Sequence, residues 1–138
     1  MMNKRSKFQQ GFTLIELLIV MAILAMLAGV VGPTIIGKMG GARVDTAKTQ
    51  IKNLETSLDA YRLDVGKYPR SLNALLKNEG NSKLWNGPYI KKSVPQDPWK
   101  NSYQYRKPGR HSNDYDLYSF GADGKEGGAE DDADVVNW

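Results

Sequence analysis

The sequence contains no cysteine and only one histidine among its 138 residues. No disulfide can therefore cross-link the chain, and cysteine-based catalysis and a zinc site with two histidines of one chain are both excluded. The single histidine, His111, lies in a polar turn, where we expect it to be exposed rather than catalytic. These absences argue against an enzyme.

A surplus of one charge is also missing once the first residues are set apart. The chain has 19 basic and 15 acidic residues, and three of the basic ones, Lys4, Arg5 and Lys7, precede the first apolar segment. The remaining charges nearly balance, and no basic patch with interleaved aromatic residues remains. We therefore expect no nucleic-acid partner.

What the sequence does have is one long apolar segment. The 20 residues from Leu17 to Ile36 carry no charge, and as a helix they would span about 30 Å, enough to cross a bilayer. Glu16 directly precedes this segment, and a carboxylate near bilayer depth costs about 2.5–3.5 kcal/mol. Either Glu16 has a partner in the membrane, or it lies in the headgroup region of an ordinary anchor. The segment is too long for the apolar core of a cleaved secretory signal.

The residues around Glu16 carry a family resemblance. Residues 11–16 read Gly-Phe-Thr-Leu-Ile-Glu after a basic leader, which resembles the signal of type IV pilins and type II secretion pseudopilins. The resemblance implies that a membrane peptidase cleaves after Gly11 and methylates Phe12. The new amine of Phe12 would lie near Glu16 on one helix face. Glu16 could pair with its own amine; the resemblance implies that it pairs with the amine of a neighbouring subunit.

Hydrophobic periodicity predicts a second helical stretch over residues 42–65. Apolar residues recur there at alternating spacings of three and four, which is typical of a helix that packs one face on a core. They are Val44, Ala47, Ile51, Leu54, Leu58, Tyr61 and Val65. We expect Pro33 to kink the chain before this stretch and Gly66 to end it.

Shorter elements follow in the prediction. We expect a short helix capped by Ser71 and reaching about Lys77, and three strands that form a small antiparallel sheet against the long helix. The strand candidates are Tyr89–Lys91, Ser102–Arg106 and Tyr115–Ser119, and residues 120–138 are expected to form a loop.

The globular part extends the resemblance to the G-type major pseudopilins of type II secretion. It rests on Tyr-Pro at 68–69, on residues 95–103 and 116–124, and on the closing Asn-Trp. Lys100 stands where the family usually has glycine, and Ser102 where it often has proline. The resemblance implies an α+β pilin-like fold with a cleaved leader at 1–11, a transmembrane and assembly helix at 12–36, and a globular domain at 37–138.

The acidic C-terminal region is the candidate binding site. Residues 120–134 gather carboxylates around glycines, and composition alone leaves open a calcium site or a solvated acidic tail. The resemblance implies Ca²⁺. Its implied ligands are Asp123, Asp132, Asp134 and the main-chain carbonyl of Phe120, with Asp131 as a rival to Asp132. Glu126 and Glu130 are expected to be solvated or to lie in the outer shell of the ion.

The function that the resemblance implies is structural. Copies of the chain would form a homopolymer, the periplasmic pseudopilus that drives export of folded proteins across the outer membrane. The implied location is the bacterial inner membrane, crossed once, with the C-terminal domain in the periplasm. The implied partners are the prepilin peptidase, minor pseudopilins and the inner-membrane assembly platform. The alternatives are a type IV pilin for adhesion, motility or DNA uptake, and a membrane-anchored calcium-binding domain that never polymerises.

Overall fold

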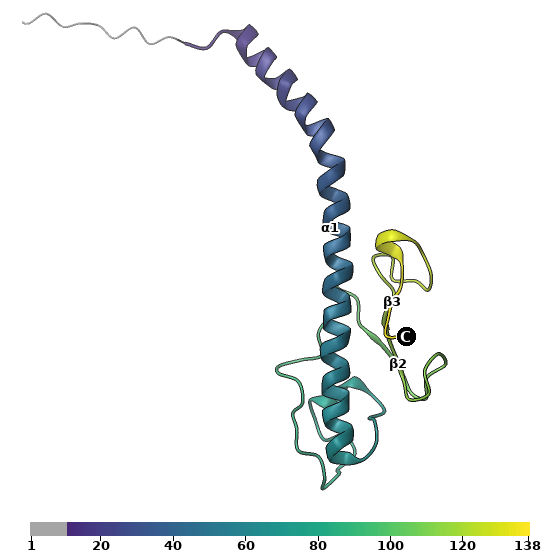
Figure 1. Cartoon of the computed structure of the whole chain (residues 1–138). Helices are drawn as coiled ribbons and strands as arrows, with labels where there is room; N and C mark the ends of the chain where they lie inside the picture. The colour runs from purple at the N-terminus through teal and green to yellow at the C-terminus, as the bar shows by residue number, and fades with distance from the viewer. Residues whose placement is uncertain (1–10) are drawn as a thin grey trace, which may run out of the picture. The chain divides into compact units, whose positions relative to one another are not determined.

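The computed structural model describes residues 11–138, apart from the side chains of residues 32–36. Its elements are α1 (Leu14–Val65), η1 (Leu72–Leu75), β1 (Gln104–Arg106), β2 (Asp116–Ser119), η2 (Glu130–Asp132) and β3 (Val135–Val136) (Figure 1). Contacts divide the chain into two units, Met1–Gly37 and Lys38–Trp138, so α1 contributes to both. The basic leader lies outside the described residues; α1 runs through Pro33, and the kink expected there stays a prediction.

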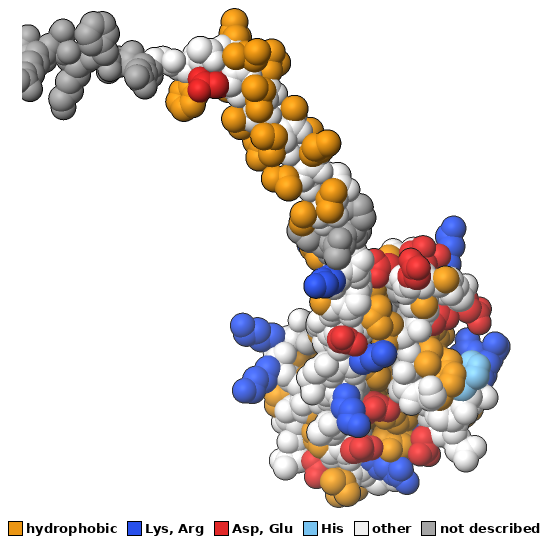
Figure 2. All heavy atoms as spheres, turned by 45° about the horizontal axis from the view of Figure 1, so that its top comes forward, with side chains coloured by type: hydrophobic (Ala, Val, Ile, Leu, Met, Phe, Trp, Pro, Cys, Tyr) orange, Lys and Arg blue, Asp and Glu red, His pale blue; other side chains and the backbone are white. Residues whose placement is uncertain are grey.

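The first unit contains the apolar start of α1. Its 18 residues Leu14–Val31 are long and apolar enough to cross a membrane, and none of them is buried by the rest of the chain. Figure 2 shows one acidic side chain among the hydrophobic side chains of this stretch. Burying apolar surface is favourable by roughly 25 cal/mol per Å², so this helix must be covered by something other than its own chain.

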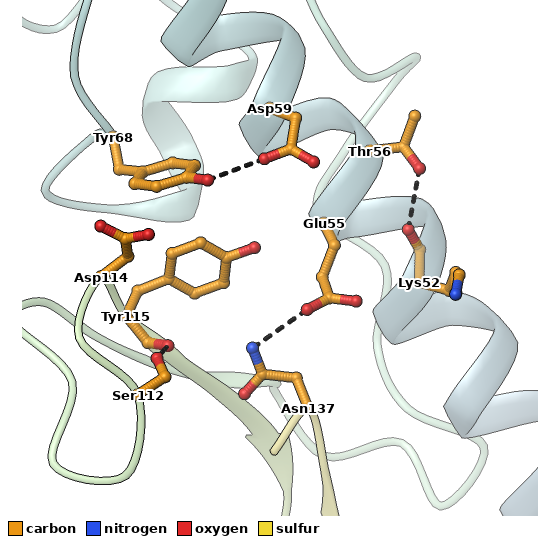
Figure 3. A pocket seen from close by; sticks show the side chains of 9 residues that line it. All are labelled: Lys52, Glu55, Thr56, Asp59, Tyr68, Ser112, Asp114, Tyr115 and Asn137. Carbon is orange, nitrogen blue, oxygen red and sulfur yellow. Dashed lines mark hydrogen bonds between the residues drawn. The ribbon is translucent and has the colours of Figure 1, made fainter.

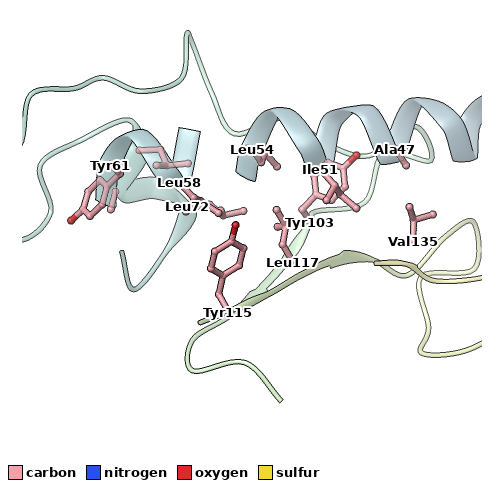
Figure 4. Packing of buried hydrophobic residues seen from close by; sticks show 12 residues of the cluster. Ala47, Ile51, Leu54, Leu58, Tyr61, Leu72, Tyr103, Tyr115, Leu117 and Val135 are labelled. Carbon is pink, nitrogen blue, oxygen red and sulfur yellow. The ribbon is translucent and has the colours of Figure 1, made fainter. Parts of the chain in front are cut away.

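The second unit is organised around the rest of α1. The predicted apolar stripe is confirmed, because Ala47 and Leu58 are fully buried, Ile51 and Leu54 nearly so, and Tyr61 is 8% exposed. These side chains point from one face of the helix toward the strands (Figure 4). The stripe is therefore the helical half of the hydrophobic core.

A three-stranded antiparallel sheet supplies the other half. The strand order is β1-β2-β3, with Tyr105 opposite Leu117 and Ser119 opposite Val135. Leu117 of the central strand is fully buried and Val135 is 4% exposed. Strands this short are not stable as an isolated sheet, so packing on α1 holds them in place.

Several predicted boundaries are wrong. Tyr89–Lys91 is not a strand: the ring of Tyr89 packs edge-on against Tyr61, and its hydroxyl donates to Asp64 at 2.7 Å. The strand predicted from Ser102 begins at Gln104, and Ser102 forms only an isolated bridge. The region 120–138 is not all loop, since it contains η2 and β3.

The predictions for the chain around the end of α1 are confirmed in part. Gly66 ends the helix with a φ of +84°, as expected for a C-terminal glycine. The next helix is only a short 3₁₀ turn, and Ser71 does not cap it with its side chain, which donates instead to Glu79 at 2.7 Å. Lys100 has a φ of +68°, so the turn keeps the backbone conformation that glycine favours.

A buried carboxylate fixes the connection between β1 and β2. Asp116 is 2% exposed and accepts hydrogen bonds from the backbone N–H groups of Arg110 at 2.7 Å, His111 at 3.2 Å and Ser112 at 3.0 Å. Burial alone raises the pKa of this carboxyl, but these hydrogen bonds outweigh it and lower the pKa to about 2. The charged form therefore stabilises the turn.

We predict that this carboxylate makes the fold acid-sensitive. Because the folded-state pKa lies below the unfolded value of about 3.9, the stabilisation is fully present above the unfolded pKa and is lost as the pH falls toward 2. It amounts to about 2.6 kcal/mol. Urea unfolding of the fragment 38–138 should show a higher free energy of unfolding for the wild type than for Asp116→Asn at pH 5. This difference should disappear as the pH is lowered to 2. Asp45→Asn, at an exposed carboxylate of α1, should show no such difference; equal behaviour of the two variants would contradict the prediction.

Candidate functional site

The N-terminus of α1 places Glu16 in a reciprocal helix cap. The backbone N–H of Thr13 donates to Glu16 Oε2 at 3.0 Å, and the backbone N–H of Glu16 donates to Thr13 Oγ1 at 3.3 Å. This is the capping box, in which Thr-x-x-Glu satisfies donors left open at a helix start. This role of Glu16 was not among the predictions, although the spacing Thr13-x-x-Glu16 is typical of it. Gly11 and Phe12 lie exposed just before the cap.

The second candidate is the acidic loop, which we define as residues 121–134. A backbone hydrogen bond joins its two ends: the N–H of Ala122 donates to the carbonyl of Asp131 at 2.8 Å. Gly121 lies at this junction with a φ of +72°, and a Cβ there would press on the carbonyl oxygens of Asp131 and Ala133. The loop is thus closed by backbone contacts that need glycine at position 121.

The predicted carboxylate ligands lie along this loop but do not converge, and Phe120, whose carbonyl is the other predicted ligand, directly precedes it. Asp123 is exposed and accepts from the N–H of Lys125 at 3.0 Å. Asp134 accepts from the N–H of Gly127 at 3.0 Å through Oδ2, while its Oδ1 is buried without a hydrogen-bond partner. Asp132 is exposed. Among residues 11–138 the structure brings no three His, Cys, Asp or Glu side chains together as a metal-binding group.

Asp131 differs from its neighbour Asp132 in what it touches. Its carboxylate lies against the backbone of α1 at Gly40, where a Cβ would overlap it. The acidic loop therefore rests on the helix through Asp131, and Gly40 provides the space.

A buried hydrogen-bond network around Asp97 joins this loop to the turn before β1. Asp97 is 3% exposed and accepts from the backbone N–H of Asn101 at 2.8 Å and from the hydroxyl of Ser119. The side chain of Asn101 donates to the carbonyl of Gly121 at 3.1 Å, and the N–H of Gly121 donates to Ser119 Oγ at 3.1 Å. The start of the acidic loop is thereby positioned from outside the loop.

A polar cleft of about 440 Å³ lies between α1, Tyr68, and residues just before β2 and just after β3. Figure 3 shows Asp59 accepting from the hydroxyl of Tyr68, at 2.8 Å, and Glu55 accepting from the side-chain amide of Asn137, at 3.1 Å. These carboxylates are engaged in joining the helix to the rest of the unit. Sequence reasoning did not predict the cleft, because its lining residues come from segments far apart in the chain.

His111 is exposed, as predicted. Its Nδ1 lies 3.2 Å from Asp116, and its ring stacks on the C-terminal Trp138 with 4.1 Å between ring centroids. These contacts tie the end of the chain to the β1–β2 connection.

Comparison with known proteins places this arrangement in a family. Residues 34–138 match the family model "Type II secretion system (T2SS), protein G", and residues 6–32 match the prokaryotic N-terminal methylation motif. The second match covers the predicted processing site and the apolar segment, so the two models together span nearly the whole chain.

Individual relatives of this chain carry the same family name. The type II secretion system core protein G of Pseudomonas aeruginosa is 47% identical over 136 residues, covering 94% of this chain and 95% of the relative. That of Vibrio cholerae is 42% identical and covers 98% and 95%. The crystal structure of the major pseudopilin from the type 2 secretion system of enterohaemorrhagic Escherichia coli matches with a TM-score of 0.57 at 34% identity, covering 75% of this chain and 92% of that one. The chain therefore belongs to the type II secretion system protein G family.

Proposed function

We propose that this chain is the major structural subunit of a type II secretion pseudopilus. The observation that carries this function is the 18-residue apolar stretch Leu14–Val31, of which nothing is buried within the chain. Lipid covers such a helix before assembly, and the helices of other copies cover it in a filament. Family membership favours this reading over a type IV pilin or an anchored domain that does not polymerise.

In this function the chain is anchored once in the inner membrane with its second unit in the periplasm. Copies leave the membrane at the assembly platform and join a filament with minor pseudopilins. The growing filament drives folded proteins through the outer membrane. The role is mechanical, and it requires a folded domain and an assembly helix rather than catalytic residues.

Processing provides the first test. A Cβ on Gly11 would meet nothing within 4 Å, so Gly11→Val leaves the chain's own structure unstrained and affects only recognition by a peptidase. We expect the Val variant to remain uncleaved, whereas the mature wild type begins with N-methylated Phe12. Gly29→Ala, within the apolar helix, should be processed normally. Mass spectrometry of the intact protein from membranes measures this, and a wild type that retains Met1 would refute the processing step.

The charge of Glu16 provides the second test, and the capping box allows a sharper design than truncation alone. A glutamine at N3 can still complete a capping box, so Glu16→Gln removes the charge but keeps the cap. Glu16→Ala removes both. If Glu16 pairs with the amine of a neighbouring Phe12, both variants insert into the membrane at least as well as the wild type, because a cost of about 2.5–3.5 kcal/mol is gone, yet neither assembles.

Filaments sheared from cells and the amount of secreted protein are the measurements. Wild-type assembly by Glu16→Gln combined with failure of Glu16→Ala would reduce Glu16 to a helix cap. Wild-type assembly by both would remove Glu16 from the mechanism.

The acidic loop supplies oxygens of the kind that calcium binds, although the structure does not bring three of its carboxylates together. Calcium takes six to eight oxygen ligands from carboxylates, carbonyls and water, and the buried Oδ1 of Asp134 is an oxygen without a hydrogen-bond donor. Asp123, Asp132, Asp134 and the carbonyl of Phe120 would hold the ion. The contact of Asp131 with Gly40 favours Asp132 over Asp131 as the remaining carboxylate ligand. A bound ion would neutralise these carboxylates and hold the loop closed.

We expect calcium to stabilise the fragment 38–138. A ligand that binds only the folded state stabilises it by about 2.7 kcal/mol at a hundredfold excess over Kd, and extracellular calcium sites often have Kd values of about 10⁻⁴–10⁻³ M. Millimolar calcium should therefore raise the melting temperature and a chelator should lower it. Asp123→Ala should abolish the difference and Glu126→Ala should preserve it. A melting temperature unaffected by calcium and by chelator would show that the loop is a solvated acidic segment.

A further inference from the structure

The second unit carries opposite charges at its two ends. The acidic loop holds six carboxylates and one lysine, and it rests on α1 at Gly40 through Asp131. Acidic side chains gather over part of this unit in Figure 2. Lys38 and Arg43 flank Gly40 on the helix, but within residues 11–138 neither lies within 4 Å of a carboxylate oxygen of the loop. The loop therefore presents negative charge to its surroundings, and Glu126 and Glu130, which are exposed and are not proposed calcium ligands, keep their charge when an ion binds.

The other end carries three clustered cations, which we call the basic cluster: Lys67, Arg70 and Lys107. The ammonium of Lys107 donates to the carbonyl of Tyr68, which fixes this side chain over the turn after α1. This contact places Lys107 beside Lys67 and Arg70, which lie one and two residues from Tyr68 in the chain. Partial burial, together with the charges of Lys67 and Arg70, lowers the pKa of Lys107. All three are exposed.

No carboxylate on the described part of the chain neutralises the basic cluster. Asp114 partly offsets the lowering of the pKa of Lys107, but its ion pair is with Arg62, at 3.6 Å. None of the three cations has a carboxylate oxygen within 4 Å among residues 11–138. The cluster is thus an exposed group of like charges that gains stability from an anionic surface.

The acidic loop cannot provide that surface within the same molecule. Residues 40–65 of α1 span about 38 Å at 1.5 Å per residue, and the basic cluster follows the end of the helix. Figure 1 shows the loop beside the first turns of α1 in this unit and the chain after Val65 at the opposite end of the helix. Two complementary surfaces at opposite ends of one body form a head-to-tail contact, and such contacts build open filaments.

We propose that the basic cluster of one subunit docks on the acidic loop of a second copy, stacking second units end to end along the filament. This inference rests on the proposed filament function and adds a second contact to the one made by the apolar helices. Stacked copies would be displaced by about 40 Å along α1, the helical span of 38 Å plus the contact. The contact is electrostatic, and salt screens it over a Debye length of about 8–10 Å.

Charge reversal in the full-length protein tests this docking. Lys67→Glu with Arg70→Glu should reduce sheared filaments by about tenfold or more, because like charges then face each other. Glu126→Lys with Glu130→Lys should do the same, and neither glutamate is a proposed calcium ligand. Combining all four changes should restore filaments. The matched control, Lys83→Glu with Lys91→Glu, reverses two exposed lysines outside both surfaces and should leave assembly unchanged.

Cysteine cross-linking provides a readout that does not depend on filament yield. Because the natural chain contains no cysteine, the pair Lys67→Cys and Ala129→Cys introduces the only thiols. They are too far apart to bridge within one subunit, since a disulfide needs Cα atoms closer than about 7 Å. Mild oxidation of filaments should therefore give a ladder of dimers, trimers and longer chains. The pair Lys67→Cys and Lys91→Cys should give no ladder.

The outcomes separate this inference from the filament function. Wild-type chains that never form filaments would refute the proposed function. If wild-type filaments form but neither charge-reversed pair loses them and the first cysteine pair gives no ladder, only the end-to-end docking is wrong. A third outcome is that the basic-cluster variant forms no filaments, the variant with all four changes does not recover them, and no ladder forms. The basic cluster then contacts another anionic surface, and the proposal is likewise wrong.

Discussion

Packing between one face of α1 and the central strand β2 is the constraint on which the second unit depends. Leu58 of the helix and Leu117 of the strand are both fully buried, and the strands on either side of β2 are only two and three residues long. Such a sheet has no stability of its own. The positions of the polar cleft, the β1–β2 connection and the acidic loop all follow from how β2 is held against the helix.

Local patterns predicted the parts of the fold that are themselves local. The spacing of three and four identified the buried stripe of α1, and Gly66 marked its end, because both depend on residues close in sequence. The strands were less predictable. Val135–Val136 is too short to show an alternation, and it becomes a strand only by pairing with residues near Ser119. Tyrosine is common in strands, but the position of Tyr89 is determined by tertiary contacts with Tyr61 and Asp64.

The candidate sites divide in the same way. Residues 11–16 form a contiguous motif, so the sequence alone predicts a processing site and a role for Glu16, and the capping role of Thr13 could be predicted from the same spacing. For the acidic loop, the sequence predicted only a segment rich in carboxylates and glycines and not the arrangement of its side chains. Which carboxylate points outward, which touches Gly40 and which is buried depends on positive φ angles and on hydrogen bonds from Asn101 and Ser119. Those partners are distant in sequence, and no short pattern encodes them.

The network around Asp97 has a consequence for when and where the domain can fold. This carboxylate joins the turn at residues 97–101 to Ser119, and through it to Gly121. It performs the cross-linking that a pair of thiols performs in many exported domains, but it requires neither an oxidant nor an isomerase. The two loops are therefore closed equally well in a reducing and in an oxidising compartment. Maturation of this domain is independent of the redox machinery that many exported proteins must wait for.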